Sequence, residues 1–136
     1  MTIGFTVLTN VEIPVARLAD ACEWYCEKLG FVEQWRGDGL AFIALPGEGV
    51  RFFLVETTDS VRLGFTGVRK GVQHSVVDFY APDLAAAHAE LRSRGVDLGD
   101  LQADSPGFSF RDLDGNRFGV HSDLGSYEHR KDNPTL

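Results

Sequence analysis

The chain contains two copies of one sequence pattern, displaced from each other by 66 positions. The segment VEIPVARLADACEWYCEKLGF starts at Val11 and aligns with VDFYAPDLAAAHAELRSRGV, which starts at Val77. The second segment is one residue shorter, and a gap of one residue aligns Gly30 with Gly95. At the original displacement, PGEGVRFF from Pro46 aligns with DLDGNRFG from Asp112. Two long, irregular copies are not a solenoid array, so the duplication predicts two fused modules of the same fold.

Each copy begins with an apolar, β-rich segment and continues with an amphipathic helix. In the first copy, apolar residues recur at the spacings of three and four that define one helix face: Leu18, Cys22, Tyr25 and Leu29. In the second copy, Asp83 is a suitable N-cap and Gly95 suits the position after the last turn. Both copies therefore predict a strand followed by a helix.

Three short strands are expected after each helix, because runs rich in β-branched and aromatic residues alternate with turn residues. The expected strands lie at about 31–35, 40–45 and 50–56 in the first copy and at about 96–101, 107–111 and 116–122 in the second. This predicts a βαβββ order in each module. We expect one domain over residues 1–124, with module one at about 5–57, a linker at 58–70 and module two at about 71–123. The polar segment 125–136 is expected to be a partly disordered C-terminal tail.

Charge and composition argue against several classes of partner. Twenty acidic residues against thirteen basic ones give a net charge of −7, which disfavours binding to a nucleic-acid backbone and suits neutral or cationic ligands. The first residues do not have a signal-peptide pattern, and no apolar run approaches the length of a membrane span. We therefore expect a cytoplasmic protein with neither nucleic acid nor membrane as partner. Cys22 and Cys26 form no zinc-binding spacing and are expected to be reduced thiols.

The duplicated βαβββ order, the sequence EWYCEKLGF at the end of the first helix and FRDLDGN before the last strand together resemble the vicinal oxygen chelate superfamily, over about residues 5–123. This superfamily includes glyoxalase I, extradiol dioxygenases, fosfomycin-resistance enzymes and bleomycin-resistance proteins. The resemblance implies an α+β fold in which two tandem βαβββ modules form a cup-shaped mixed sheet with helices on the outside. By analogy with the family, a homodimer is also expected.

Metal-dependent members of this family carry their ligands on the first and last strands of each module. The resemblance places these positions at Asn10, Phe53, Val76 and Gly119. Valine, phenylalanine and glycine side chains offer no lone pair, whereas a divalent cation needs several nitrogen or oxygen donors. We therefore expect no metal ion and no other cofactor, so the chain is closest in character to the metal-free members similar to bleomycin-resistance proteins.

The cup that the resemblance implies would be lined by side chains two residues apart along each strand. From the first strands of the two modules, the expected lining residues are Asn10, Glu12, His74, Val76, Asp78 and Tyr80. The closing strands add Phe53, Val55 and His121. Phe108 and Phe110 share one strand face and are further candidates for ligand contact, but the sequence leaves open whether that face meets the cup or the helix.

Four titratable residues among these are candidates for chemistry. Glu12 and Asp78 occupy equivalent positions and could bind a cationic group or share a proton, or could simply be solvated. His74 and His121 could act as acid and base near neutral pH, or could be structural hydrogen-bonding residues. The acids of the DLDGN segment are explained by a turn, in which Asp and Asn side chains bond to the local backbone.

Three function classes remain open. The first, which we favour, is a metal-free binding protein of the glyoxalase/bleomycin-resistance type that captures an organic metabolite or antibiotic, as in antibiotic resistance. The second is a metal-dependent lyase, isomerase or dioxygenase, which the missing donors count against. The third is a metal-free acid–base enzyme that uses Glu12, His74, Asp78 or His121. The sequence thus favours a binding protein over an enzyme.

Overall fold

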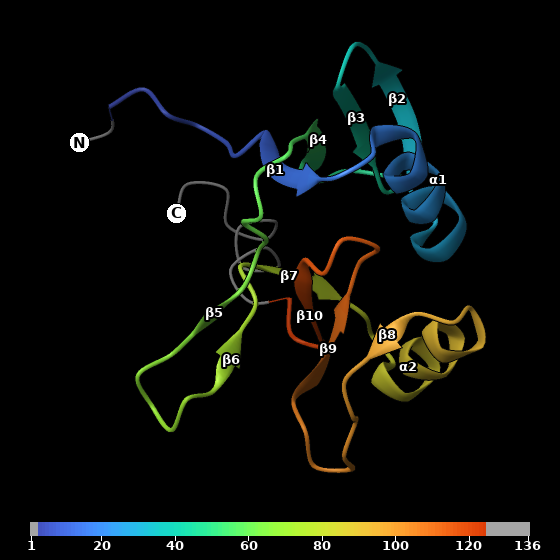
Figure 1. The fold of residues 1–136 in the computed structure, drawn as a ribbon. Helices are drawn as coiled ribbons and strands as arrows, with labels where there is room; N and C mark the ends of the chain where they lie inside the picture. The colour runs from blue at the N-terminus through green and yellow to red at the C-terminus, as the bar shows by residue number, and fades with distance from the viewer. Residues whose placement is uncertain (1–2, 125–136) are drawn as a thin grey trace. The chain divides into compact units, whose positions relative to one another are not determined.

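The computed structural model describes residues 3–124, so the predicted tail at 125–136 lies outside the described residues. The chain divides into two compact units (Figure 1). Unit 1 contains the chain up to Leu63 together with Asp112–Asn116, and unit 2 contains Gly64–Arg111 and the chain from Arg117 onward. Each unit holds one copy of the predicted βαβββ order, and the α+β fold class is confirmed.

Unit 1 contains one helix and a four-stranded sheet in the order β1-β4-β3-β2. Its elements are β1 (Asn10–Val15), α1 (Leu18–Leu29), β2 (Val32–Arg36), β3 (Leu40–Ala44) and β4 (Arg51–Glu56). Strands β1 and β4 are parallel, and the other pairs are antiparallel. Parallel neighbours need a crossover between them, and α1 with the β2–β3 hairpin provides it.

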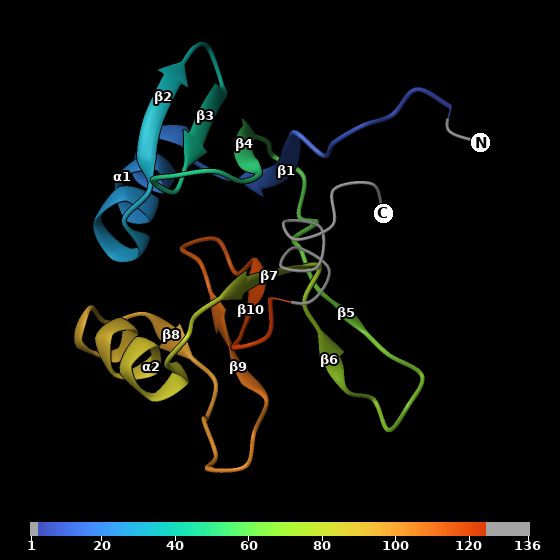
Figure 2. The same ribbon diagram turned by 180° about the vertical axis from the view of Figure 1, so that it is seen from behind.

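Unit 2 repeats this topology with a four-stranded sheet in the order β7-β10-β9-β8 (Figure 2). Its elements are β7 (Val77–Tyr80), α2 (Leu84–Ser93), β8 (Asp97–Leu98), β9 (Gly107–Arg111) and β10 (Arg117–His121). As in unit 1, the first and last strands, β7 and β10, are parallel. Asp83 caps α2 as predicted, because its Oδ1 accepts a hydrogen bond from the Ala86 N–H at 3.0 Å.

Two parts of the strand prediction were wrong in detail. The strand expected at 96–101 is reduced to Asp97–Leu98. The linker expected at 58–70 contains β5 (Phe65–Thr66), which pairs with β6 (Gln73–His74) in a small antiparallel hairpin. Lys70 and Gly71 both have positive φ, at 54° and 64°, and the Val72 N–H next to them donates to the Arg69 carbonyl. This is the pattern of a two-residue type I′ turn. Strands of two residues show no readable alternation, so this hairpin was missed.

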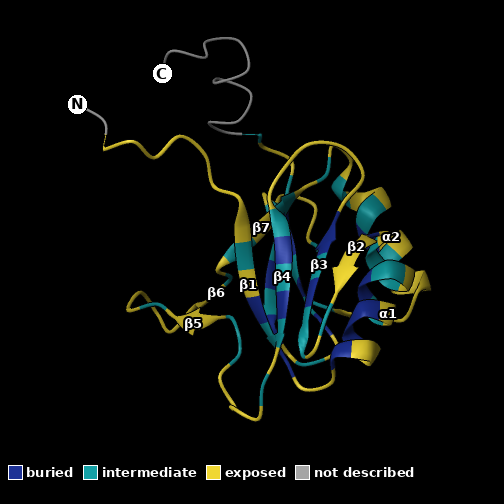
Figure 3. Ribbon diagram, turned by 90° about the horizontal axis from the view of Figure 1, so that it is seen from above, coloured by how far each residue is buried: buried dark blue, intermediate teal, exposed yellow. Residues whose placement is uncertain are grey.

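Each sheet packs one face against its own helix, and alternate residues along β3, β4, β9 and β10 are therefore buried (Figure 3). In unit 1 the buried face carries Ile13, Val15, Ile43 and Leu54, which pack with the helix residues Leu18, Ala21, Cys22 and Tyr25. In unit 2 the buried face carries Phe108, Phe110, Phe118 and Val120. Burial of a side chain of this size stabilises the fold by about 1.5–3 kcal/mol.

The turn Asp112–Asn116 belongs to unit 1 and is held there by buried hydrogen bonds. The Tyr25 hydroxyl donates to Asp112 Oδ2 at 2.6 Å, and the Asn116 side-chain amide donates to Asp112 Oδ2 at 2.8 Å and to the Pro14 carbonyl at 2.9 Å. Asp112 Oδ1 accepts the backbone N–H groups of Asp114 and Asn116. Burial raises the pKa of the Asp112 carboxyl, although these hydrogen bonds oppose the shift. The acids of the turn therefore have the structural role expected of them.

No helix within residues 3–124 has both the length and the apolar character needed to cross a membrane.

Candidate functional site

The face of each sheet opposite its helix, here called the helix-free face, carries most of the predicted site residues. In unit 1 this face presents side chains from all four strands: Asn10, Glu12, Trp35, Leu40, Phe42, Arg51, Phe53 and Val55. In unit 2 it presents Asp78, Tyr80, Ser109, Arg117, Gly119 and His121. The two faces are built alike but differ in chemistry, since the face of unit 1 carries three aromatic rings and the face of unit 2 is mainly polar.

Three aromatic rings form a row across β2, β3 and β4 on the helix-free face of unit 1. The Phe42 and Phe53 rings are stacked, with centroids 4.5 Å apart and planes 16° apart, and the Trp35 ring centroid lies 6.0 Å from that of Phe42. Strand register explains the row, because Trp35 pairs with Phe42 and Phe42 pairs with Phe53. Aromatic pairs at such distances contribute about 0.5–1.5 kcal/mol beyond the area that they bury.

A β-bulge places Trp35 in this row. The pairing of β2 with β3 shifts between Glu33 and Trp35, so that Gln34 is the extra residue. Without the bulge, Gln34 would face Phe42 and the indole would point to the other side of the sheet. Gly37 also helps, since a Cβ built there would lie 2.5 Å from the Trp35 ring. The indole remains 49% exposed, and it therefore offers ring surface to a ligand.

Arg51 adds a positive charge to the aromatic row. Its guanidinium carbon lies 4.1 Å from the centroid of the Phe42 ring, a cation–π contact, and its Nε donates to Asn10 Oδ1 at 3.1 Å. Of the predicted site residues in unit 1, Asn10 contacts Arg51 and Phe53 contacts Phe42. The sequence did not indicate Trp35, Phe42 or Arg51 as site residues. Arg51 could have been predicted, because it lies two residues before Phe53 and therefore on the same face of β4.

Glu12 and Val55 lie at the β1 edge of the same sheet. They line a cavity of about 370 Å³ together with Ile13, Pro14, Thr57, Asp59 and Val61. Parallel pairing of β1 with β4 brings these two predicted residues together, because Glu12 is opposite Phe53 and Pro14 is opposite Val55.

In unit 2, Asp78 and His121 lie in one groove of about 500 Å³ on the helix-free face. Asp78 Oδ2 is 4.0 Å from His121 Nε2. Gly119 makes room for the carboxylate, because a Cβ at this position would collide with Asp78 Oδ1. The groove also contains the hydroxyls of Ser75 and Ser109 and the side chain of Arg117.

Three other candidates lie apart from this groove, and a fourth, Phe108, lines it although most of its side chain is buried. His74, expected on the first strand of module two, lies instead on β6, where its ring stacks on Phe65 at 5.3 Å. Phe108 and Phe110 are buried on the helix side of the sheet, and Phe108 contacts the His88 ring at 4.9 Å. Both rings belong to the core, although Phe108 also lines the groove that contains Asp78 and His121. Val76 precedes β7 and is 55% exposed.

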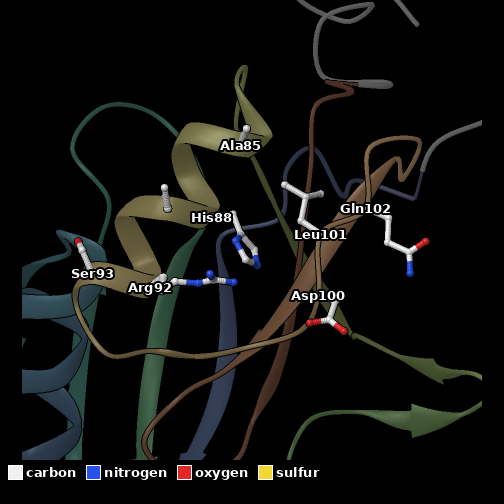
Figure 4. Close-up of a pocket in the computed structure, with 8 residues that line it drawn as sticks. Ala85, His88, Arg92, Ser93, Asp100, Leu101 and Gln102 are labelled. Carbon is white, nitrogen blue, oxygen red and sulfur yellow. The ribbon is translucent and has the colours of Figure 1, made fainter.

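A second groove in unit 2, of about 640 Å³, contains none of the predicted residues (Figure 4). It runs between α2 and the chain after β8, and it is lined by Ala85, His88, Ala89, Arg92, Ser93, Asp100, Leu101 and Gln102. His88 Nε2 is 2.9 Å from the Gly99 carbonyl oxygen, so this buried histidine is bonded to backbone. This bond gives His88 a structural role.

The residues do not fit the metal ion that metal-dependent relatives would hold. Phe53, Val76 and Gly119, at three of the four implied positions, have no donor atom in their side chains. Among residues 3–124, no group of three or more His, Cys, Asp or Glu side chains is placed to hold a metal. Asp78 and His121 supply only two donors, fewer than zinc or iron sites require.

Comparisons with known proteins agree with this fold. A family model described as Glyoxalase/Bleomycin resistance protein/Dioxygenase superfamily matches residues 7–120. A comparison with curated protein sequences gives no significant match.

Among solved structures, the chain is similar to TnmS3, an antibiotic binding protein from Streptomyces sp. CB03234, with a TM-score of 0.70 and 22% identity over 89% of this chain and 98% of that one. A glyoxalase/bleomycin resistance protein/dioxygenase superfamily member from Sphaerobacter thermophilus DSM 20745 has a TM-score of 0.70 and 19% identity over 88% and 98% of the two chains. TioX from Micromonospora sp. ML1 has a TM-score of 0.65 and 17% identity over 87% and 99%. At these identities the similarity establishes the fold.

Proposed function

Because the chain belongs to the glyoxalase/bleomycin resistance protein/dioxygenase superfamily, we propose that it binds a small organic molecule, a metabolite or an antibiotic, without a metal ion. The ligand-binding residues that we propose from the sequence are Asn10, Glu12, Phe53 and Val55 in unit 1 and His74, Val76, Asp78, Tyr80, Phe108 and His121 in unit 2. Phe110, also expected from the sequence, is left out because it is only 2% exposed. To these we add Trp35, Phe42 and Arg51. Location in the cytoplasm and assembly as a homodimer are part of the proposal and rest on charge, composition and family analogy.

The observation that carries the proposal is the aromatic row of Trp35, Phe42 and Phe53. Aromatic rings in a sheet are usually buried against a helix or a second sheet, yet these three project from the face opposite α1. Flat ring surface beside a fixed cation is suited to a planar or unsaturated ligand, which gains both burial and a directed polar contact. The antibiotic-binding role of TnmS3, which has the same fold, is consistent with this proposal.

The donor chemistry supports the metal-free part of the proposal. Lewis-acid activation of vicinal oxygens requires an ion held by several nitrogen or oxygen ligands. Phenylalanine, valine and glycine at the implied positions cannot supply them. A metal-dependent lyase or dioxygenase would have to use a different set of residues.

A metal-free acid–base enzyme is the second candidate, and the pair of Asp78 and His121 favours it. The two side chains lie 4.0 Å apart and are partly exposed to the groove. Both residue types can move protons near neutral pH. Turnover of a bound ligand by the wild-type protein that is lost in His121→Ala would support this candidate over simple binding.

The binding proposal is tested first by native mass spectrometry of the purified full chain, which should show a co-purifying organic molecule. A panel of planar natural products should then be titrated calorimetrically against wild type and Phe53→Ala. We expect Phe53→Ala to weaken binding of the best ligand by about 5- to 150-fold, since loss of one stacked ring costs about 1–3 kcal/mol.

Phe65→Ala provides the matched control. Phe65 is also an aromatic strand residue and is 55% exposed, but it lies on the β5–β6 hairpin. Its removal should leave affinity within about twofold of wild type. Equal losses in the two variants, or no ligand from the panel or from the cell, would contradict the proposed function.

A further inference from the structure

The helix-free faces of the two units differ most at one pair of equivalent positions, Phe53 and Gly119. In unit 1, Glu12 is the register partner of Phe53 across β1 and β4. In unit 2, Asp78 is the register partner of Gly119 across β7 and β10. With no side chain at Gly119, the Asp78 carboxylate occupies the space above β10, where a Cβ would collide with its Oδ1. The position that carries a stacking ring in unit 1 therefore carries a carboxylate in unit 2.

A backbone hydrogen bond sets the tautomer of His121. The Asp123 N–H donates to His121 Nδ1 at 3.3 Å. A ring nitrogen that accepts a hydrogen bond carries no proton, so the neutral imidazole has its proton on Nε2. Nε2 is the atom that faces Asp78 Oδ2. The groove thus presents a donor, His121 Nε2–H, next to an acceptor, the Asp78 carboxylate.

The distance between these atoms leaves room for one further atom. At 4.0 Å, Asp78 Oδ2 and His121 Nε2 are too far apart for a direct hydrogen bond. An oxygen about 2.8 Å from both would see them at an angle of about 90°, which a single hydroxyl can bridge. The two side chains are 53% and 38% exposed, so a solute can reach the gap from the groove.

Only some chemical groups satisfy both partners. A hydroxyl accepts from His121 Nε2–H and donates to the Asp78 carboxylate. A carboxylate would be repelled by Asp78, and an ammonium group would place its N–H against the N–H of the imidazole. We infer that Asp78 and His121 form a site in unit 2 that recognises the hydroxyl group of a small organic molecule, an alcohol or a phenol. This inference rests on the proposed function in that it takes the chain to bind small organic molecules.

The other polar groups of the groove are compatible with this assignment. The Ser75 hydroxyl oxygen lies 3.6 Å from the point where a Cβ of residue 119 would stand, and Ser109 is the β9 register partner of Gly119. These hydroxyls extend the polar surface around the bridged oxygen. Arg117 and Asp100 are the other charged residues that line the groove, one of each sign.

The test uses the full chain labelled with ¹⁵N and two probes, phenol and its methyl ether anisole. Anisole has the same ring and an oxygen that accepts, but it has no proton to donate to Asp78. The imidazole ¹⁵N shifts should first identify Nε2 as the protonated nitrogen of His121 at pH 8. Phenol should then shift the His121 ring and Gly119 amide signals with an affinity about tenfold or more above that of anisole, as expected for a hydrogen bond to a charged acceptor.

Asp78→Asn and Asp100→Asn form a matched pair of variants, because each neutralises one carboxylate of the same groove. Asp78→Asn should reduce the preference for phenol to about threefold or less, and Asp100→Asn should leave it unchanged. Gly119→Ala, which displaces the Asp78 carboxylate without removing it, should act like Asp78→Asn. Spectra of each variant that match wild type away from the groove establish that it is folded.

Several results would overturn the inference: a proton on Nδ1, equal affinity for phenol and anisole, no response of His121 to phenol at about 50 mM, or a phenol preference that survives Asp78→Asn. None of these results bears on the aromatic row of unit 1. Binding of an organic ligand with the Phe53 dependence described above, together with any of these results, would leave the proposed function standing and remove this inference alone.

Discussion

The Tyr25 hydroxyl donates a hydrogen bond to Asp112, a residue 87 positions later in the chain, and this bond joins α1 to the turn Asp112–Asn116. Burial and the nearby carboxylate raise the pKa of the Tyr25 hydroxyl well above its ordinary value. The hydroxyl therefore stays protonated and remains a donor across the accessible pH range. A buried carboxylate is costly unless it is hydrogen-bonded, so the tyrosine has a stabilising role that its apolar ring alone would not explain.

We expect Tyr25→Phe to lower the free energy of unfolding by about 1.5–3 kcal/mol, because it removes a hydrogen bond to a buried charged group and leaves the aromatic packing in place. Chemical denaturation followed by circular dichroism measures the change. Tyr80→Phe is the matched control, since Tyr80 is 45% exposed and its hydroxyl should contribute less than about 0.5 kcal/mol. Similar losses in the two variants would contradict the role assigned to the Tyr25 hydroxyl.

At the scale of elements, α1 begins without a capping side chain of its own. Its N-cap residue is Arg17, which makes no side-chain cap bond. The Leu18 N–H instead donates to Glu56 Oε2, from the end of β4, at 2.8 Å. A carboxylate at this place satisfies one free backbone donor of the first turn and interacts favourably with the helix dipole. Strand β4 therefore helps to fix where α1 starts.

Glu56→Ala should lower the free energy of unfolding by about 1 kcal/mol, which is the usual effect of losing an N-cap bond. Glu48→Ala, at an exposed acid in the preceding turn, removes the same side chain without a helix start nearby and should change stability by less than about 0.5 kcal/mol. Thermal melts of the two variants compare them directly. A Glu56→Ala protein as stable as Glu48→Ala would mean that water caps α1 equally well.

The elements were predictable to the extent that local sequence determines them. Helix α2 has its cap, Asp83, and its terminal Gly95 in sequence, and the duplication gave the βαβββ order twice. Neither the bulge at Gln34 nor the cap from Glu56 has a local signal, because each depends on pairing between distant segments. For this reason the sequence indicated Phe53 as a site residue but not Trp35 or Phe42, whose positions follow from the register of three strands.

For the molecule as a whole, the two modules keep one backbone topology and differ in what they present on their helix-free faces. Equivalent positions carry Phe53 and Gly119, Val55 and His121, and Glu12 and Asp78. Only the last of these pairs conserves its chemistry. Duplication followed by such divergence gives one chain two surfaces with different chemistry, one with a row of three aromatic rings and one that is mainly polar. The alignment of the copies indicates the differences at these three positions, whereas the aromatic row also depends on the strand register that places Trp35 and Phe42.

The lack of donor atoms at the implied metal positions also predicts how the protein responds to added metal ions. A metal that binds the native state but not the unfolded chain raises the melting temperature with its concentration. With donors missing at Phe53, Val76 and Gly119, we expect Zn²⁺, Fe²⁺, Mn²⁺ and Ni²⁺ at a few molar equivalents to shift the melting temperature by less than about 1 °C. Treatment with a chelator should likewise leave both the melting temperature and ligand affinity unchanged.

Scanning calorimetry with and without each ion, after dialysis against chelator, provides the measurement. A saturable rise at one equivalent that is lost in Asp78→Asn and in His121→Ala would show that these two residues recruit a metal with further ligands, and would replace the metal-free proposal with a metal-dependent one.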